Sequence, residues 1–169
     1  MQRPLPDILQ RDLKVVFCGI NPGQSAAQAG HHFLGRGNRF WKTLHLAGFT
    51  PIQLDPTEDA RLLEFGCGIT AAVPRASRSA AEVSTLELAD GLRELEAKIR
   101  RVRPRVIAML GKAAWSAYTG GARFGWGRQP QRFAGSEAWV LPNPSGLNRG
   151  FSLDDLVGAY RELRLSLED

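Results

Sequence analysis

Cysteine is scarce in this sequence, and its scarcity excludes several kinds of site. Cys18 lies in an apolar run, and Cys67 lies far from it between two glycines. No pair has the spacing of zinc or iron–sulfur ligands, so we expect neither a zinc site nor an iron–sulfur cluster. A disulfide is not expected in a reducing compartment.

Long hydrophobic runs are also missing. No segment approaches the roughly 18 consecutive apolar residues of a membrane span. The amino-terminal segment, MQRPLPDILQRD, lacks the apolar core that secretory signals carry. We therefore expect a cytoplasmic protein with no membrane partner. The 169 residues contain no repeat, low-complexity tract or long linker, which predicts one domain over 1–169.

Acidic residues are fewer than basic ones. The net charge is +5 and the pI is about 9.8. This balance favours acidic partners, nucleic acid first. Many small proteins are basic for reasons other than binding, so the charge alone leaves both interpretations open.

Strand and helix patterns alternate along the chain. Short apolar segments rich in β-branched residues predict buried strands, and capping residues with helical spacing predict helices between them. The expected strands are 14–18, 69–73, 105–110 and 138–141. The expected helices start near Asn38, Asp55, Ser84, Lys112 and Ser152.

This alternation predicts the α/β class: a three-layer sandwich in which a mostly parallel sheet of four to five strands has helices on both faces. The glycine-rich segment after the first strand is expected to be a long loop, and segment 120–135 to be either a hairpin or a surface loop. Ligands of such sheets bind beyond the carboxyl ends of the strands, so the site is expected in the loops that follow them.

Two of those loops have unusual sequences. The first strand is followed by GINPG (19–23) and the fourth by NPSGLNR (143–149). Proline and glycine can fix such turns so that an amide side chain or backbone N–H groups are held in place. The same residue types also make plain tight turns, so the composition by itself does not decide between the two.

These two loops, in this order at strand ends, resemble the mismatch-specific uracil/thymine-DNA glycosylase family of the uracil-DNA glycosylase superfamily. The resemblance runs over nearly the whole chain, through VVFCGINPG, NRFWKTLHLAGFT, MLGKAA, WVLPNPSGLNR and AYREL. GINPG alone is a weak signal. The occurrence of GINPG, NRFWK and NPSGLNR in this order is highly specific. The resemblance implies cleavage of the N-glycosidic bond to uracil, without a cofactor, in double-stranded DNA and preferably opposite guanine. We also expect a monomer associated with the nucleoid.

The resemblance assigns roles in the base pocket. Asn21 is the catalytic residue; an amide takes up no proton at neutral pH, so it would orient a water rather than act as a general base. More active relatives carry a carboxylate there and a histidine at the place of Asn143, so we expect a slow enzyme. Gly19 and Ile20 would line the pocket, and Phe33 would stack on the flipped base, unless it is an ordinary core residue.

The second loop resembles the family's wedge. Leu147 would enter the base stack where uracil has left, and its neighbours would contact the opposite guanine or a phosphate. Lys112, at a strand-to-helix junction, would bind a phosphate or be an ordinary solvated lysine. The expected DNA-binding residues are Lys112, Ser145, Gly146, Leu147, Asn148 and Arg149.

Three further residues are weaker candidates. Asp90 precedes Gly91 in a predicted helix, where glycine indicates a close approach, so Asp90 is a candidate for a compensating catalytic carboxylate. A surface helix acid is the competing interpretation. His31 and His32 precede Phe33 and are either solvated or functional.

Two other functions remain open. The chain could be a DNA-mismatch binding module that keeps the fold without the chemistry, since Asn21 replaces a carboxylate. It could also be a nucleotide-binding protein that uses GINPG for phosphate. Strand breaks at uracil after alkali, or tight binding of free nucleotide without preference for duplex, would separate these from the enzyme.

Overall fold

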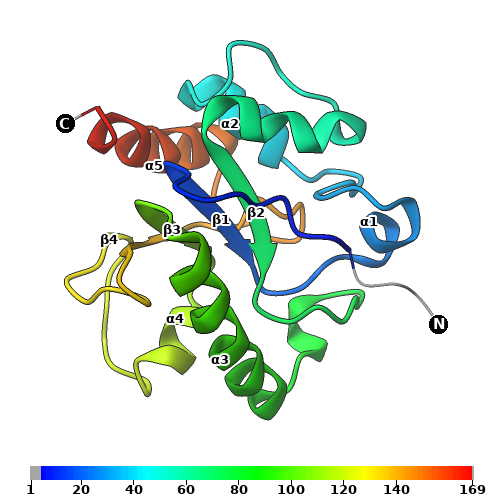
Figure 1. Ribbon diagram of the computed structural model, residues 1–169. Coiled ribbons are helices and arrows are strands. Elements are labelled where there is room, and N and C mark those ends of the chain that lie inside the picture. Colours follow the sequence, from blue (N-terminus) through cyan, green and yellow to red (C-terminus); the bar gives the residue numbers. More distant parts are fainter. Residues whose placement is uncertain (1–4, 169) are drawn as a thin grey trace.

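Five strands form one sheet in the computed structural model, which describes residues 5–168. Their order is β2-β1-β3-β5-β4 (Figure 1). Every pairing is parallel except that of the short edge strand β4 with β5, which is antiparallel. The strands are β1 (Val15–Gly19), β2 (Cys67–Ala71), β3 (Val106–Leu110), β4 (Gly127–Arg128) and β5 (Glu137–Leu141).

Helices cover both faces of this sheet, which confirms the predicted three-layer α/β class (Figure 1). The elements α2 (Phe40–Ala47), η1 (Pro56–Phe65) and α5 (Leu153–Ser166) pack on one face. On the other face lie α3 (Thr85–Val102) and α4 (Ala113–Tyr118). Two short elements, α1 (Gln24–Ala29) and η2 (Ala80–Glu82), belong to the connecting loops.

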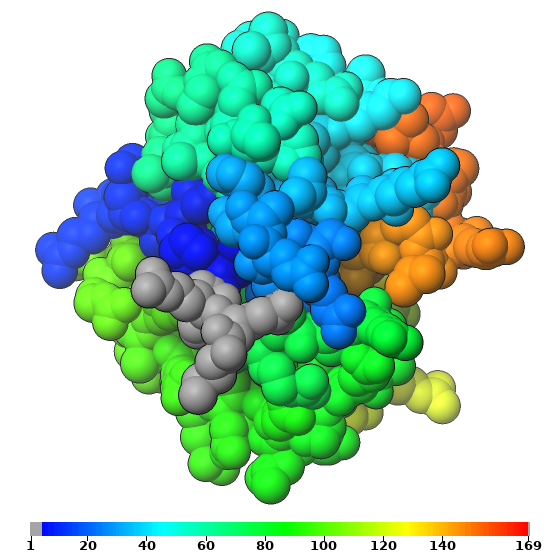
Figure 2. All heavy atoms as spheres, turned by 90° about the vertical axis from the view of Figure 1, so that its right-hand side faces the viewer, coloured from blue at the N-terminus to red at the C-terminus, as the bar shows by residue number. Residues whose placement is uncertain are grey.

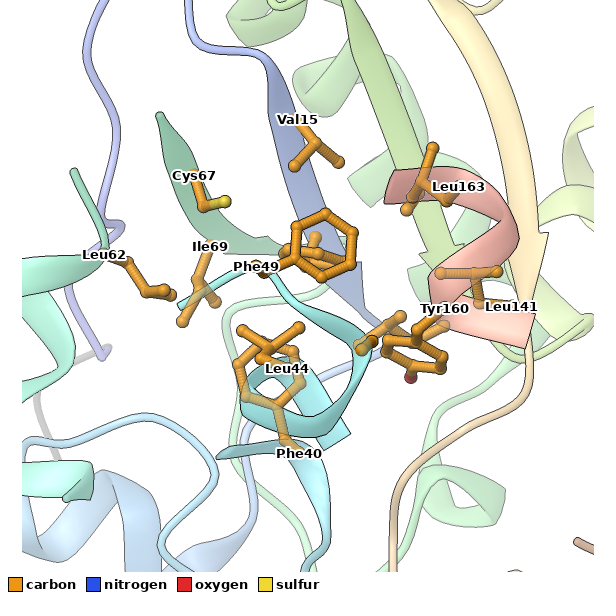
Figure 3. Packing of buried hydrophobic residues seen from close by; sticks show 14 of the residues in the cluster. Val15, Phe40, Leu44, Phe49, Leu62, Cys67, Ile69, Leu141, Tyr160 and Leu163 are labelled. Atoms are coloured by element: carbon orange, nitrogen blue, oxygen red, sulfur yellow. The ribbon is translucent and has the colours of Figure 1, made fainter. Parts of the chain in front are cut away.

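The core follows from the alternation of side chains along each strand. Val15 and Phe17 of β1 pack toward α2 and α5, whereas Val16 and Cys18 pack toward α3. Figure 3 shows the first of these clusters, in which aromatic rings from separate elements meet. The Phe17 ring centroid lies 5.5 Å from that of Phe40 in an edge-to-face contact, which fixes α2 against the middle of the sheet.

The predicted capping residues are largely confirmed. Ser84 accepts a hydrogen bond from the Glu87 amide, and Ser152 forms a reciprocal capping box with Asp155. Asp55 and Glu58 also form a capping box, but the element they start, η1, is a 3₁₀ helix. None of the helices in the described part of the chain is long and apolar enough to span a membrane.

Two local predictions differ from the structure, and a third had been left open. Strand β2 was expected at 69–73 but spans Cys67–Ala71, because Cys67 and Gly68 pair with Val15 and Val16 of β1. The packing there requires glycine, since a Cβ on Gly68 would lie 2.5 Å from the Ile8 carbonyl oxygen. The expected long loop after β1 contains the short helix α1. Segment 120–135, for which a hairpin and a surface loop were both open, contains both: residues 120–126 form a loop, and β4 pairs with β5 in an antiparallel hairpin.

Candidate functional site

A cleft of about 790 Å³ opens at the carboxyl edge of the sheet. Figure 2 views the molecule from the right of Figure 1; blue, green and orange segments, far apart in sequence, meet on this face. The cleft lies between three loops, which we call the β1–α1 loop (20–23), the β2–α3 loop (72–84) and the β5–α5 loop (142–152). It is lined mainly by residues 19–26, 32–38, 77–81, 143 and 145–148. The structure thus brings both motifs of the sequence to one place.

The β1–α1 loop is built into the structure by backbone hydrogen bonds. The amide of Ala72 donates to the Gly19 carbonyl at 2.9 Å, and that of Val73 donates to the Ile20 carbonyl at 2.8 Å. The Ser77 amide donates to the Pro22 carbonyl at 3.1 Å. The loop therefore continues the parallel pairing of β1 with β2 beyond the sheet, which leaves it little freedom to move.

The side-chain amide of Asn21 has a defined orientation. Its Nδ2 donates to the Arg75 carbonyl and to the Ser77 hydroxyl, both at 2.7 Å. The Ser77 hydroxyl gives its own hydrogen to the Ser79 carbonyl at 2.6 Å, so it must accept from Asn21. Both amide hydrogens of Asn21 are thus used, and its Oδ1 is left as an acceptor on a residue that lines the cleft.

Phe33 forms part of the cleft wall. Its ring stacks on that of Phe40 with centroids 3.9 Å apart and planes 24° from parallel. The backbone of Phe33 has a φ of 55°, in the left-handed region that non-glycine residues rarely adopt. A half-buried ring supported on one face and lining the cleft is suited to stacking on a planar base.

The two histidines hold the loop that carries Phe33. The carboxylate of Asp59 accepts from the His32 amide at 2.9 Å and lies 3.4 Å from Nδ1 of His31. Burial lowers the pKa of His32, and its Nε2 lies 2.6 Å from the Pro6 carbonyl oxygen. A carbonyl only accepts, so Nε2 carries the hydrogen. His32 is therefore a neutral, buried residue that also lines the cleft.

Asn143 presents a free donor. Its Oδ1 accepts from the Ser145 amide at 2.9 Å, which fixes the orientation of the side chain. Within residues 5–168, its Nδ2 has no hydrogen-bond partner. Since Asn143 lines the cleft, this Nδ2 can donate to an acceptor bound there.

The β5–α5 loop has a rigid turn with an exposed apolar tip. The Leu147 amide donates to the Ser145 hydroxyl at 3.2 Å, and the Asn148 amide donates to the Ser145 carbonyl at 3.0 Å. Leu147 itself is 73% exposed, far beyond what a leucine that only packed the loop would show. The loop also approaches Gly37 closely, because a Cβ on Gly146 would lie 2.9 Å from the Gly37 carbonyl oxygen.

Sequence reasoning missed two residues that organise the site. Ser77 accepts from Asn21, and Arg39 donates hydrogen bonds to several carbonyls of the β5–α5 loop. Arg39 belongs to the NRFWK motif, which indicated the family without a role for this side chain. Ser77 lies in a stretch without a distinctive pattern, so no sequence signal marked it.

Three expected site residues lie outside the cleft lining. Lys112 is exposed, with its Nζ 4.8 Å from the centroid of the Trp126 ring, and Arg149 is exposed next to the β5–α5 turn. Asp90 requires a correction: its side chain is 62% exposed and pairs with Arg93 at 3.7 Å. The glycine beside it is needed because a Cβ on Gly91 would lie 2.1 Å from the Ala72 carbonyl oxygen.

The thiols are not nucleophiles at neutral pH. Cys18 and Cys67 are free and buried, and burial raises the pKa of each to about 12. In the part of the chain that the structure describes, no group of three or more His, Cys, Asp and Glu side chains could hold a metal ion.

The comparison with known families identifies the chain. The model of the uracil DNA glycosylase superfamily matches residues 6–164. This chain belongs to the uracil DNA glycosylase superfamily. A solution NMR structure of a Methanosarcina acetivorans protein, provisionally named a uracil DNA glycosylase, is similar in fold, with a TM-score of 0.65 and 20% sequence identity. The match covers 96% of this chain and 98% of that protein.

Proposed function

We propose that this superfamily member is a monofunctional DNA glycosylase of the mismatch-specific type, which hydrolyses the N-glycosidic bond of uracil opposite guanine and leaves an abasic site. The observation that carries the proposal is the orientation of Asn21: both of its amide hydrogens are donated to the β2–α3 loop, which leaves Oδ1 as a fixed acceptor beside a cleft that can hold a pyrimidine.

The cleft residues suit the charges of such a reaction. As the bond breaks, the sugar gains oxocarbenium character and the departing base becomes an anion. Phe33 would stack on the extruded base, and Nδ2 of Asn143 would donate to a base oxygen as negative charge develops. Gly19 and Ile20 would form the floor of the pocket beside the base.

Asn21 would orient the attacking water. Its Oδ1 would accept a hydrogen bond from the water. This hydrogen bond would direct a lone pair of the water oxygen toward the sugar carbon. An amide cannot take up the proton that the water loses, which passes to the released uracil anion directly or through solvent. This side chain therefore contributes positioning and no general-base catalysis. This limit supports a slow enzyme.

The β5–α5 loop would act on the duplex. The exposed Leu147 would fill the space left by the base, and the backbone around Gly146 and Asn148 would contact the widowed guanine. Lys112, Ser145 and Arg149 would bind phosphates or support the loop. The positive net charge of the chain agrees with a DNA partner.

One observation favours a second function, a mismatch-binding module without chemistry. No Asp or Glu is present among the described residues that line the cleft, and Asp90 lies outside it. Among the described lining residues, no carboxylate therefore replaces the one that Asn21 lacks. Binding of G·U duplex without base release would identify this function.

The test is a single-turnover panel in which uracil and thymine are placed opposite guanine, opposite adenine and in single strands. We expect uracil opposite guanine to be excised fastest, because only there do the wedge and the guanine contacts both act. Equal rates opposite guanine and adenine would contradict the mismatch preference and leave general uracil excision standing.

A further inference from the structure

Arg39 connects the start of α2 to the β5–α5 loop. It is the residue before α2, and its guanidinium donates to three carbonyls of that loop: Phe151 at 2.7 Å, Asn148 at 2.9 Å and Ser145 at 3.1 Å. Its Nε lies 3.4 Å from the Pro144 carbonyl oxygen, and its backbone amide donates to the same oxygen at 3.0 Å. One residue thus holds both sides of the turn that carries Leu147.

The charge of Arg39 is compensated by backbone carbonyl oxygens. No Asp or Glu among residues 5–168 lies within ion-pair distance of its guanidinium, so only carbonyl oxygens compensate the charge. A planar guanidinium presents its donors in a fixed fork, whereas a lysine ammonium cannot reach four separate carbonyls in one plane. This arrangement depends on arginine and not only on positive charge.

The neighbours of Arg39 support the other half of the site. Asn38 accepts a hydrogen bond from the Phe40 amide at 2.9 Å, and the Phe40 ring carries the stacked ring of Phe33. Two adjacent residues therefore contact the two halves: Arg39 contacts the loop with the exposed leucine, and Phe40 contacts the wall of the base cleft.

We propose that Arg39 is a positioning residue that presents Leu147 to the duplex and keeps it in register with the base cleft. This inference rests on the proposed glycosylase function and deepens it. Its consequence is a selective effect: Arg39 should matter where a base must be extruded from a stack and matter little where the base is already unpaired.

The experiment compares Arg39→Met and Arg39→Lys with wild type on uracil in a G·U duplex and in a single strand, in single turnover. We expect Arg39→Met to slow duplex excision by about tenfold to a hundredfold, the scale of a misplaced functional group, and single-strand excision by less than about threefold. Arg39→Lys should keep the charge and still lose most of the duplex rate.

The matched control is Arg105→Met. Arg105 also donates to backbone carbonyls, those of Ser166 and Leu167, but at the amino end of β3, away from the cleft. We expect this variant to change both substrates by the same small factor. Equal losses on duplex and single strand for Arg39→Met would overturn the proposal.

Hydrogen exchange gives a readout that does not need catalysis. In Arg39→Met the amides of Ser145, Leu147 and Asn148 should exchange faster than in wild type, whereas Arg105→Met should leave them unchanged. Unaltered exchange at these amides would contradict the positioning role. A wild-type protein that releases no uracil from either substrate would instead contradict the proposed function. The exchange rates would still test whether Arg39 positions the β5–α5 loop.

Discussion

The β1–α1 loop and the β5–α5 loop resemble each other in sequence but are held in different ways. The first continues the sheet through backbone pairing with the β2–α3 loop, and its Asn21 side chain is fixed by two hydrogen bonds. The second has a local turn, a distant arginine as its support and an exposed leucine at its tip. Under the proposed function, the first loop would be a fixed part for chemistry and the second a projecting part for DNA.

The largest effect should come from Asn21→Ala. If Oδ1 holds the attacking water, its loss should slow uracil release by about a hundredfold to a thousandfold, the cost of removing one preorganised contact at a reacting centre. Affinity for G·U duplex should change little, because the β5–α5 loop is intact. The measurement is single-turnover release together with equilibrium binding. Most of the wild-type rate remaining in Asn21→Ala would refute the assignment.

Leu147→Ala should affect the projecting part alone. Burial of this side chain in the flipped complex should contribute about 1.5–3 kcal/mol. Its loss should slow duplex excision by about tenfold to a hundredfold at 1.4 kcal/mol per decade, and single-strand excision much less. Leu86→Ala is the control, because Leu86 is 72% exposed on α3. A similar loss on both substrates would mean that Leu147 only maintains the loop.

Ser77→Ala should weaken the fixed part without removing its catalytic residue. The variant loses one hydrogen bond to Asn21, an interaction of about 0.5–1.5 kcal/mol, so release should slow by at most about tenfold. Ser136→Ala is the control, since its buried hydroxyl donates to the Pro104 carbonyl away from the cleft. The expected pattern is a lower rate at unchanged affinity and on both substrates. A loss confined to duplex would place Ser77 with the DNA-binding residues instead.

The salt dependence of duplex affinity tests the contacts between the protein and DNA phosphates. If Lys112, Arg149 and other cations neutralise about four phosphates, the slope of log affinity against log salt should be about −3.6 for duplex DNA. Lys112→Met should make that slope shallower by about 0.9. Titrations of labelled duplex over a range of salt provide the slopes. An unchanged slope in Lys112→Met would leave Lys112 as a solvated lysine over Trp126.

The smallest effect concerns His32 in the wall of the base cleft. Burial lowers its pKa from 6.5, so the unfolded chain takes up the proton first as pH falls below that value. The free energy of unfolding should therefore decrease below about pH 6.5, the ordinary pKa of the unfolded group. His32→Gln, which keeps a donor for Pro6, should flatten this part of the profile. Denaturant unfolding from pH 7.5 to pH 5 measures the free energy of unfolding of both proteins. If the two curves against pH are parallel, His32 is not the group that titrates.

Much of the fold could be predicted, because the strands are short apolar runs and the helices begin at capping residues such as Ser84 and Ser152. The start of β2 could not be predicted from the sequence, since the close packing at Gly68 is a tertiary contact. In the site, the two motifs predicted which loops meet. Ser77 and Arg39 escaped prediction because their partners lie 56 and about a hundred residues away, as in the contact between Arg39 and Asn148 at a separation of 109.

Asp90 shows the opposite error. The sequence correctly indicated a close approach at Gly91, but the approaching group is the Ala72 carbonyl at the end of β2. The helical periodicity then places Asp90 on the exposed side, beside Arg93. A glycine in a helix thus signals contact without identifying what makes it.

The most direct test of the account measures uracil release from a G·U duplex with the protein in excess, followed by alkaline cleavage of the strand. We predict free uracil and an alkali-labile site at the uracil position for wild type, and release that is about a hundredfold to a thousandfold slower for Asn21→Ala under the same conditions. Tight binding of the duplex by wild type without any released base would contradict the account and would identify a mismatch-binding module instead.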